Sequence, residues 1–166
     1  MAKKGRSWKQ KNTDVEESGK ALASALRTLT RRDHSEVELR RKLQDKGFAG
    51  GEVDAAIGKL KALGYLDDRR FAGQWAESAI RNGRGFGPRI RLELRRRGVS
   101  DSVIADVFAR LAEDYGEEET LAALLARKFA GFKPNSADDR EKRRVIGYLQ
   151  RRGFSIAAIL NVFREQ

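Results

Sequence analysis

One short pattern, which occurs three times, constrains the fold of this chain more than any other feature. Each copy reads Leu-x-x-x-Gly followed by an apolar residue, and the copies align without gaps at Leu43–Phe48, Leu94–Val99 and Leu149–Phe154. Their glycines lie 51 and then 55 residues apart. A glycine directly after an apolar helical pattern is typical of a helix C-terminus. Regular spacing of this length is typical of a tandem array in which each unit packs on its neighbours.

Apolar residues around each copy recur with the period of a helix, and no segment alternates with the period of a strand. The chain of 166 residues contains only two prolines, which also argues against an all-β fold rich in tight turns. We therefore predict an all-α fold, built as a tandem array of three three-helix, helix-turn-helix-like repeats that is elongated and curved. The predicted division is a basic flexible arm over 1–17 and repeats over 18–66, 67–116 and 117–166.

Caps and glycines set the predicted helix boundaries. Ser35 and Glu38 form a capping box in which each side chain bonds the backbone N–H of the other residue. The first helix is predicted to begin near Val15, with Leu22, Leu26 and Leu29 facing inward. The other predicted helices begin at Ser35, about Glu52, Asp67–Asp68, Gly87–Pro88, Asp101, Glu117, about Asp138 and Ser155. Four aromatic residues on these periodic faces are predicted to lie in the core, namely Phe71, Trp75, Phe108 and Phe163.

The overall charge favours a polyanionic partner. There are 35 lysines and arginines against 24 acidic residues, which gives a net charge of +11. The chain has no cysteine, so disulfides and thiolate metal sites are excluded and a reducing compartment is compatible. No apolar run approaches the length of a membrane span and no signal-peptide pattern follows the basic N-terminus, so we predict a cytoplasmic protein without a membrane partner.

Arginines concentrate in the middle of the chain. From Arg81 to Arg97 there are seven arginines and a single acid, Glu93. With Ile90 and Leu94 facing inward, a helical wheel places the neighbouring arginines and Leu92 outward. Contacts with a nucleoprotein filament or its DNA are predicted for Arg81, Arg84, Arg89, Arg91, Arg95 and Arg96, with Arg40, Arg41 and Arg151 on the other repeats, and Leu92 and Phe86 are predicted partner contacts. The alternative is an ordinary solvated face, which the near absence of interleaved acids disfavours.

Other candidate sites have simpler explanations. The Gly83-x-Gly85-x-Gly87 stretch follows no strand and precedes no Gly-Lys-Ser/Thr, so a hinge is favoured over a phosphate loop. His34 is the single histidine, a poor metal ligand that is predicted to be a surface residue before the Ser35 cap. No nucleophile–base set is present, and we predict neither an enzyme nor a cofactor or metal site. Lys46, Arg97 and Arg152, one before each repeated glycine, are attributed to the helix dipole.

Several linked motifs resemble one family. The stretches Leu66-Asp67-Asp68-x-x-Phe71-Ala72 and Gly87-x-x-Ile90-x-x-Glu93-Leu94-x-x-x-Gly98-Val99 are similar to the signature of the RecX family of bacterial recombinase regulators. Ser35-x-x-Glu38-Leu39-x-x-Lys42-Leu43-x-x-x-Gly47-Phe48 and Leu63-Gly64-Tyr65-Leu66 match it too, in register from about residue 20 to the end, although the third repeat is weaker at its start. The resemblance implies three-helix repeats that bind RecA and its DNA filament and restrain filament growth, strand exchange and ATP turnover. It supplies no catalytic residues.

Two readings of the function remain as alternatives. The linked motifs favour a RecA regulator that acts by binding, whereas the charge alone would suit a general, sequence-independent binder of single-stranded or duplex DNA. Capping of filament ends and binding along the filament groove are both compatible with the first. The basic arm is either a DNA contact, in which Trp8 stacks on a base, or a solvated leader.

Overall fold

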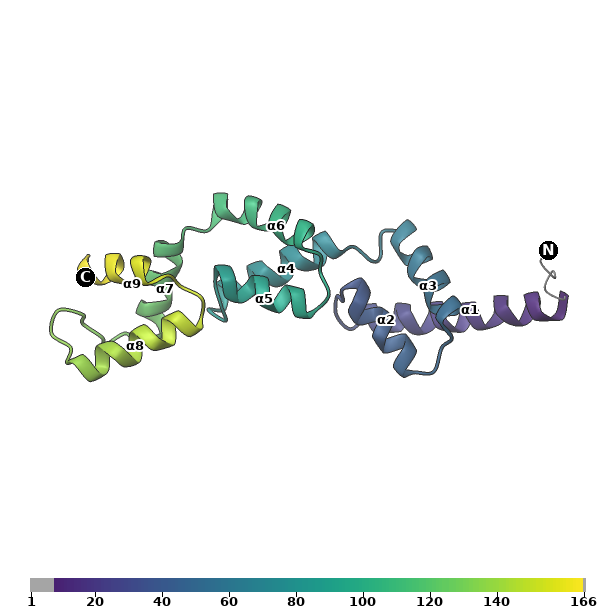
Figure 1. The fold of residues 1–166 in the computed structure, drawn as a ribbon, viewed down its shortest axis with the longest axis horizontal. Coiled ribbons are helices and arrows are strands. Elements are labelled where there is room, and N and C mark those ends of the chain that lie inside the picture. The colour runs from purple at the N-terminus through teal and green to yellow at the C-terminus, as the bar shows by residue number, and fades with distance from the viewer. Residues whose placement is uncertain (1–7, 166) are drawn as a thin grey trace, which may run out of the picture. The chain divides into compact units, whose positions relative to one another are not determined.

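The computed structural model describes residues 8–165, and every regular element in this part of the chain is an α-helix (Figure 1). These residues form nine helices, which confirms the predicted all-α class. The helices are α1 (Trp8–Leu29), α2 (Glu36–Asp45), α3 (Gly50–Ala62), α4 (Asp68–Arg81), α5 (Gly87–Arg96), α6 (Asp101–Asp114), α7 (Glu117–Lys128), α8 (Asp139–Arg151) and α9 (Ile156–Arg164).

The start of α1 corrects the sequence prediction. The helix begins at Trp8 rather than near Val15, so residues 8–17 of the predicted flexible arm are helical. This stretch contains Lys, Gln and Glu, which are good helix formers, and no proline interrupts it. Residues 1–7 lie outside the described part of the chain, and the stacking of Trp8 on a base stays a prediction.

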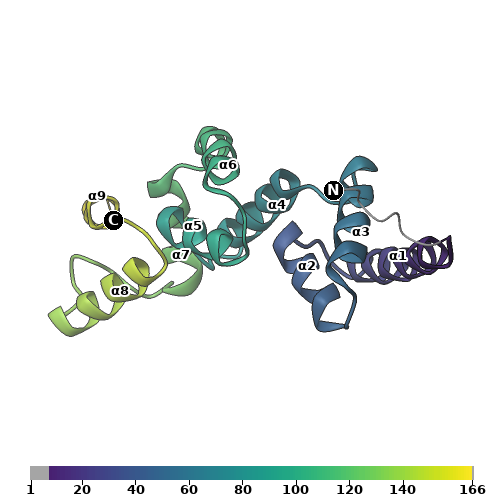
Figure 2. The same cartoon turned by 45° about the vertical axis from the view of Figure 1, so that its right-hand side comes forward.

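The core of the first three helices is centred one residue away from the predicted stripe. Ala21 and Ala25 are fully buried, whereas the predicted Leu22, Leu26 and Leu29 are packed around them and only partly buried. The small alanine side chains let α2 and α3 lie close beside the C-terminal half of α1, as both views show (Figures 1 and 2). The leucines of α2 and α3 then fill the core, with Leu39, Leu43 and Leu60 fully buried. Each such side chain contributes on the order of 1.5–3 kcal/mol to folding.

In the structure, each copy of the Leu-x-x-x-Gly pattern places its leucine in the core and ends its helix at the glycine, as predicted. Leu43, Leu94 and Leu149 are all fully buried. Each helix then ends in a turn whose glycine has a left-handed backbone, with φ of +82° at Gly98 and +98° at Gly153. Because only glycine adopts this conformation without strain, the three helix ends are fixed by the sequence.

The C-terminal helices follow the prediction closely. Asp138 accepts a hydrogen bond from the Glu141 N–H at 2.7 Å and Ser155 accepts one from the Ala158 N–H at 3.1 Å, so both predicted helix starts are confirmed. The four aromatic residues predicted to lie in the core differ in burial. Phe71 and Phe163 are buried as predicted. Trp75 and Phe108 are only partly buried, which corrects their assignment to the core. An arginine lies over each of these two rings, as described below.

The described residues form two compact units. The first extends to Phe71 and also includes Arg97–Val99, and the second contains Ala72–Arg96 and the residues from Ser100 onward. One boundary therefore lies within α4, and the others flank Arg97–Val99. Among the described helices, none combines the length and the apolar character needed to cross a membrane.

Candidate nucleic-acid interface

The outer side of α5 carries the densest group of the predicted contact residues. Arg95 and Arg96 are well exposed, with 55% and 62% of their side-chain surface accessible. Arg89 is 45% exposed and Leu92 is 40% exposed. Ile90 and Leu94, on the opposite side of the helix, are buried. The predicted orientation of α5 is therefore confirmed.

Acidic partners lie closer to these arginines than the sequence indicated. Glu93 pairs with Arg89 at 3.0 Å and with Arg96 at 3.4 Å, because both arginines are within one turn of it on the same helix. Asp101 pairs with Arg95 at 2.6 Å, because the chain reverses at Gly98 and returns along α6. The expectation of an arginine face without acids is therefore wrong. The face keeps a surplus of positive charge, since two carboxylates meet three exposed guanidinium groups.

Arg91 lies differently from its neighbours. Its guanidinium group sits 4.0 Å from the centre of the Phe108 ring, and the residue is partly buried. Such a cation–π contact is worth about 0.5–1 kcal/mol near a surface. Phe108, which is only partly buried, therefore packs against the arginine over its ring. Arg91 therefore has a packing role in addition to its charge.

Arg81 and Arg84 flank the glycine-rich loop between α4 and α5. Arg81 donates from Nε to the Tyr115 hydroxyl at 2.9 Å, and this hydrogen bond raises the pKa of the guanidinium group. Arg84 donates to the Ser78 hydroxyl at 2.8 Å and lies 5.9 Å from the centre of the Trp75 ring. Both side chains are exposed.

Phe86 is held within the chain. Its ring stacks on Phe154 with centroids 5.2 Å apart, and its backbone N–H donates to the Arg152 carbonyl oxygen at 2.7 Å. The loop over Gly83–Gly87 is therefore tied to the turn after α8. These contacts account for Phe86 without a partner, and we leave it out of the contact surface proposed below.

The remaining predicted contact residues differ in whether an acidic side chain is paired with them. Arg40 lies between Glu36, at 3.5 Å, and Asp54, with which it makes a close ion pair, so its charge is neutralised locally. The hydrogen bond to Asp54 is the main reason that the pKa of Arg40 is raised. Arg41 and Arg151 are exposed, and neither has an acidic partner among the residues that the structure describes.

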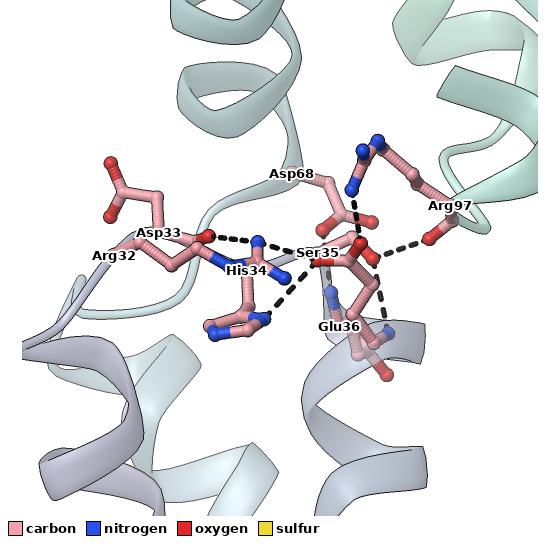
Figure 3. A network of polar contacts seen from close by, with 8 residues as sticks. Arg32, Asp33, His34, Ser35, Glu36, Asp68 and Arg97 are labelled. Atoms are coloured by element: carbon pink, nitrogen blue, oxygen red, sulfur yellow. Dashed lines mark hydrogen bonds and ion pairs between the residues drawn. The ribbon is translucent and has the colours of Figure 1, made fainter. Parts of the chain in front are cut away.

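A buried polar network in the first compact unit is absent from the sequence prediction (Figure 3). Ser35 is fully buried, accepts from the Glu38 N–H at 3.1 Å and donates to the Arg97 carbonyl oxygen. The Glu38 carboxylate faces Arg97 at 2.5 Å and His34 at 3.2 Å instead of returning to the Ser35 N–H. Half of the predicted capping box is therefore wrong. The N-terminus of α2 is capped by Ser35 and also by Asp68, which accepts from the Glu36 N–H at 2.8 Å.

Burial and charge shift the ionisation of this network. His34 is only 4% exposed, which corrects its assignment to the surface. Burial, followed by the charge of Arg32, lowers the pKa of His34, so that the imidazole is neutral at pH 7. Burial acts to raise the pKa of Glu38, but the positive charges of Arg32 and Arg97 outweigh it, and the pKa of Glu38 is lowered.

The three basic residues before the repeated glycines also make tertiary contacts. Lys46 donates to the Ser24 hydroxyl at 2.9 Å, Arg97 pairs with Glu38, and Arg152 donates to the Arg84 carbonyl oxygen at 2.9 Å. Their structural assignment is therefore supported, but the helix dipole alone does not explain them. The recurrence of one basic residue at the same position in three copies was the sequence signal for this role.

Comparison with known proteins places the chain in one family. Models of the first, second and third three-helix domains of RecX match residues 21–60, 67–107 and 116–163. Regulatory protein RecX of Trichlorobacter lovleyi is 43% identical over 142 residues, which cover 86% of this chain and 92% of that protein. Regulatory protein RecX of Syntrophotalea carbinolica is 38% identical over 146 residues, covering 88% and 95% of the two chains.

The fold agrees with this relationship. A crystal structure of regulatory protein RecX superimposes with a TM-score of 0.78 at 20% identity, covering 100% of this chain and 83% of that chain. The three-helix domains occur in the same order along the sequence as in the family models. The chain belongs to the RecX family of regulatory proteins.

Proposed function

We propose that this protein binds RecA recombinase and its nucleoprotein filament in the cytoplasm, and so limits filament growth, ATP turnover and strand exchange. Membership of the RecX family supports this role, because the curated relatives are named regulatory proteins. The protein acts by binding, without chemistry of its own. DNA in the filament contributes to the binding through its phosphates.

The observation that carries the proposal is the exposed arginine group on α5. Arg95 and Arg96 are paired with acids, but ion pairs at an exposed surface are worth only about 0–1 kcal/mol. A phosphate that forms a bidentate contact with a guanidinium group therefore competes well with these carboxylates. Exposed Leu92, between the arginines, adds an apolar contact suited to a protein partner.

The proposed contact surface consists of the outward residues of α5 and the loop before it. Its arginines are Arg81, Arg84, Arg89, Arg91, Arg95 and Arg96, and Leu92 is its protein contact. Arg41 and Arg151 contribute further cations, whereas Arg40 is neutralised by its two acids.

Replacing Arg91, Arg95 and Arg96 together with Ala tests this surface. Exposed charges seldom change stability by more than about 0.5 kcal/mol each, and the Phe108 contact adds about 0.5–1 kcal/mol, so the variant is expected to fold. Inhibition of the RecA ATPase is expected to weaken markedly, because several cationic contacts are lost at once. The two measurements are thermal unfolding and the ATPase rate at increasing concentrations of the regulator.

Two further variants serve as controls. Replacing Arg110, Lys128 and Arg164 with Ala removes the same number of exposed positive charges elsewhere and should leave inhibition nearly unchanged. Leu94→Ala removes a fully buried side chain and should cost about 2–5 kcal/mol of stability. A folded α5 variant that inhibits as well as the wild type would show that this face is merely solvated.

General DNA binding is the second candidate, favoured by the net charge of +11. The arrangement of Asn and Gln around the arginines does not suggest that base edges are read, so binding to DNA alone should be independent of sequence and should fall steeply with salt. Retention of RecA from a DNase-treated extract separates the two candidates. A general DNA-binding protein retains no RecA once the DNA is destroyed.

A further inference from the structure

A basic groove lies in the first compact unit, away from the residues assigned above. It has a volume of about 1020 Å³ and is bounded by the end of α1, the following turn and the outer side of α2. We call it the α1–α2 groove. Its lining residues are Arg27, Thr28, Thr30, Arg31, Arg32, His34, Lys42, Asp45 and Lys46.

The lining contains five cations and one carboxylate. Arg32 is paired with Glu38 at 3.2 Å, and Lys46 donates to Ser24 at 2.9 Å. The side chains of Arg27, Arg31 and Lys42 are exposed and have neither an ion pair nor a hydrogen bond within the described part of the chain. Among the described residues, these three cations, on two helices and the turn after α1, therefore make no ion pair.

The helix dipole explains only part of this arrangement. Arg27 and Lys42 lie in the last turns of α1 and α2, where cations are favourable. A helix end carries only about half an elementary charge, and its effect falls off within one turn. Asp45 in the lining and Glu38 beside Arg32 offset part of the five positive charges, and the net positive charge that remains exceeds what two helix ends need.

The size and chemistry of the groove favour an extended polyanion. No apolar side chain lines it, which disfavours the core of a protein–protein interface. The cations belong to two helices and the residues that follow each of them, which suits an extended anion better than a single small one. A phosphodiester chain instead presents one negative charge per nucleotide along its length.

We propose that the α1–α2 groove binds the phosphodiester backbone of a DNA strand, with Arg27, Arg31 and Lys42 as its phosphate contacts. The identification of the polyanion as DNA rests on the proposed function. The groove provides a second contact on DNA, formed by a different compact unit from the one that carries the α5 arginines. Contacts of this kind orient the protein on the strand without reading its sequence.

The test replaces Arg27, Arg31 and Lys42 together with Ala and measures binding of a fluorescein-labelled oligothymidylate by anisotropy, without RecA, at several salt concentrations. Each lost phosphate contact lowers the salt dependence of binding to single strands by about 0.7 in the log–log slope. We therefore expect the slope to fall by about two. The matched control is again Arg110, Lys128 and Arg164 replaced with Ala, which removes two arginines and one lysine outside the groove.

His34 provides a local readout because it is the single histidine and it lines the groove. Its pKa is lowered by burial and by Arg32, with Glu38 opposing and Lys42 adding to the effect. A phosphate between these cations offsets their field, so the pKa of His34 measured by NMR should rise when oligothymidylate binds. The rise should be absent from the groove variant and present in the control.

The outcomes separate this proposal from the function proposed above. If the groove variant and the wild type bind DNA with the same slope, the groove is not a DNA site, and the proposed function stands as long as the wild type still inhibits RecA. Retained DNA binding with loss of RecA capture from DNase-treated extract would assign the groove to an acidic protein surface and overturn the proposal. A wild type that neither binds oligothymidylate nor inhibits RecA would refute the proposed function itself.

Discussion

The turns after α5 and α8 each pack against the start of another helix or loop through a backbone carbonyl oxygen, but the side chains around the two contacts differ. Gly98 and Gly153 occupy equivalent positions in the repeated pattern, and so do Ser35 and Phe86, the residues against which these turns lie. At the first turn the Ser35 hydroxyl donates to the carbonyl oxygen of Arg97. At the second turn the backbone N–H of Phe86 donates to the equivalent oxygen, that of Arg152, at 2.7 Å.

The side chains around the two turns differ more than the backbone does. The first turn is held by the ion pair between Arg97 and Glu38, with His34 buried beside it. The second is held by the stack of Phe86 on Phe154. The comparison teaches that the repeat conserves a backbone contact, a carbonyl oxygen facing a helix start, while the surrounding side chains are free to be polar or aromatic.

The largest expected loss of stability comes from replacing Gly98 or Gly153 with Ala, and Gly47→Ala serves as the reference. Gly47→Ala, where the added group meets nothing within 4 Å, should cost about 1–2 kcal/mol from its φ of +87° alone. In Gly98→Ala the new group collides with the Val37 side chain, and in Gly153→Ala it collides with the Phe86 carbonyl oxygen and lies 2.8 Å from the Arg89 Cβ. Each collision should lower the free energy of unfolding by about a further 1–3 kcal/mol beyond the backbone cost, as measured by chemical unfolding.

A second substitution distinguishes the two collisions. Val37→Gly removes the Cβ and both methyl groups that the new group meets, so, measured against the Val37→Gly single variant, it should restore much of the stability lost in Gly98→Ala. Arg89→Ala should not restore Gly153→Ala, because the carbonyl oxygen and the Cβ of residue 89 remain in place. Equal rescue at both turns would contradict the difference described here.

The second prediction compares the polar and aromatic contacts directly. Glu38→Gln removes a charged hydrogen-bond acceptor that is 18% exposed and should cost about 1–3 kcal/mol. Phe154→Leu removes the ring stack and should cost about 0.5–1.5 kcal/mol. Added salt should reduce the cost of the first change, because it screens the ion pair, and should leave the second unaffected. Chemical unfolding of the wild type and of both variants at low and high salt gives the cost of each substitution under the two conditions.

The smallest effect is a pH dependence confined to the first turn. The pKa of His34 in the folded chain is lowered from its ordinary value of 6.5. Between the lowered pKa and 6.5 the unfolded chain binds a proton that the folded chain does not, so the free energy of unfolding should fall as the pH drops below 6.5. His34→Gln should flatten the thermal unfolding midpoint across this range. An identical pH profile for the wild type and the variant would show that the network does not shift the histidine.

Much of the architecture could be predicted from local sequence signals. Serine, aspartate and glycine at helix ends act on backbone groups only a few residues away, so Ser155, Asp138 and the three repeated glycines defined their helix boundaries correctly. The apolar periodicity likewise placed Leu43, Leu94 and Leu149 in the core. The linked motifs identified the family.

The candidate site was predicted less completely. A helical wheel shows which side of α5 is apolar, and it placed Arg95 and Arg96 outward correctly. It does not show which side chains approach from other helices, so it missed Asp101 beside Arg95 and Phe108 beneath Arg91.

By itself, the sequence determined the helices, their ends, the buried leucines and the family, because these depend on interactions between neighbouring residues and on the period of the helix. Only the tertiary structure decided which charges are neutralised and which are available. The Glu38–Arg97 pair joins residues 59 positions apart, and the α1–α2 groove collects cations from two helices and a turn. Charge–charge energies depend on distance and burial in three dimensions, so one arginine, Arg97, is a partly buried structural partner, whereas another, Arg31, is exposed.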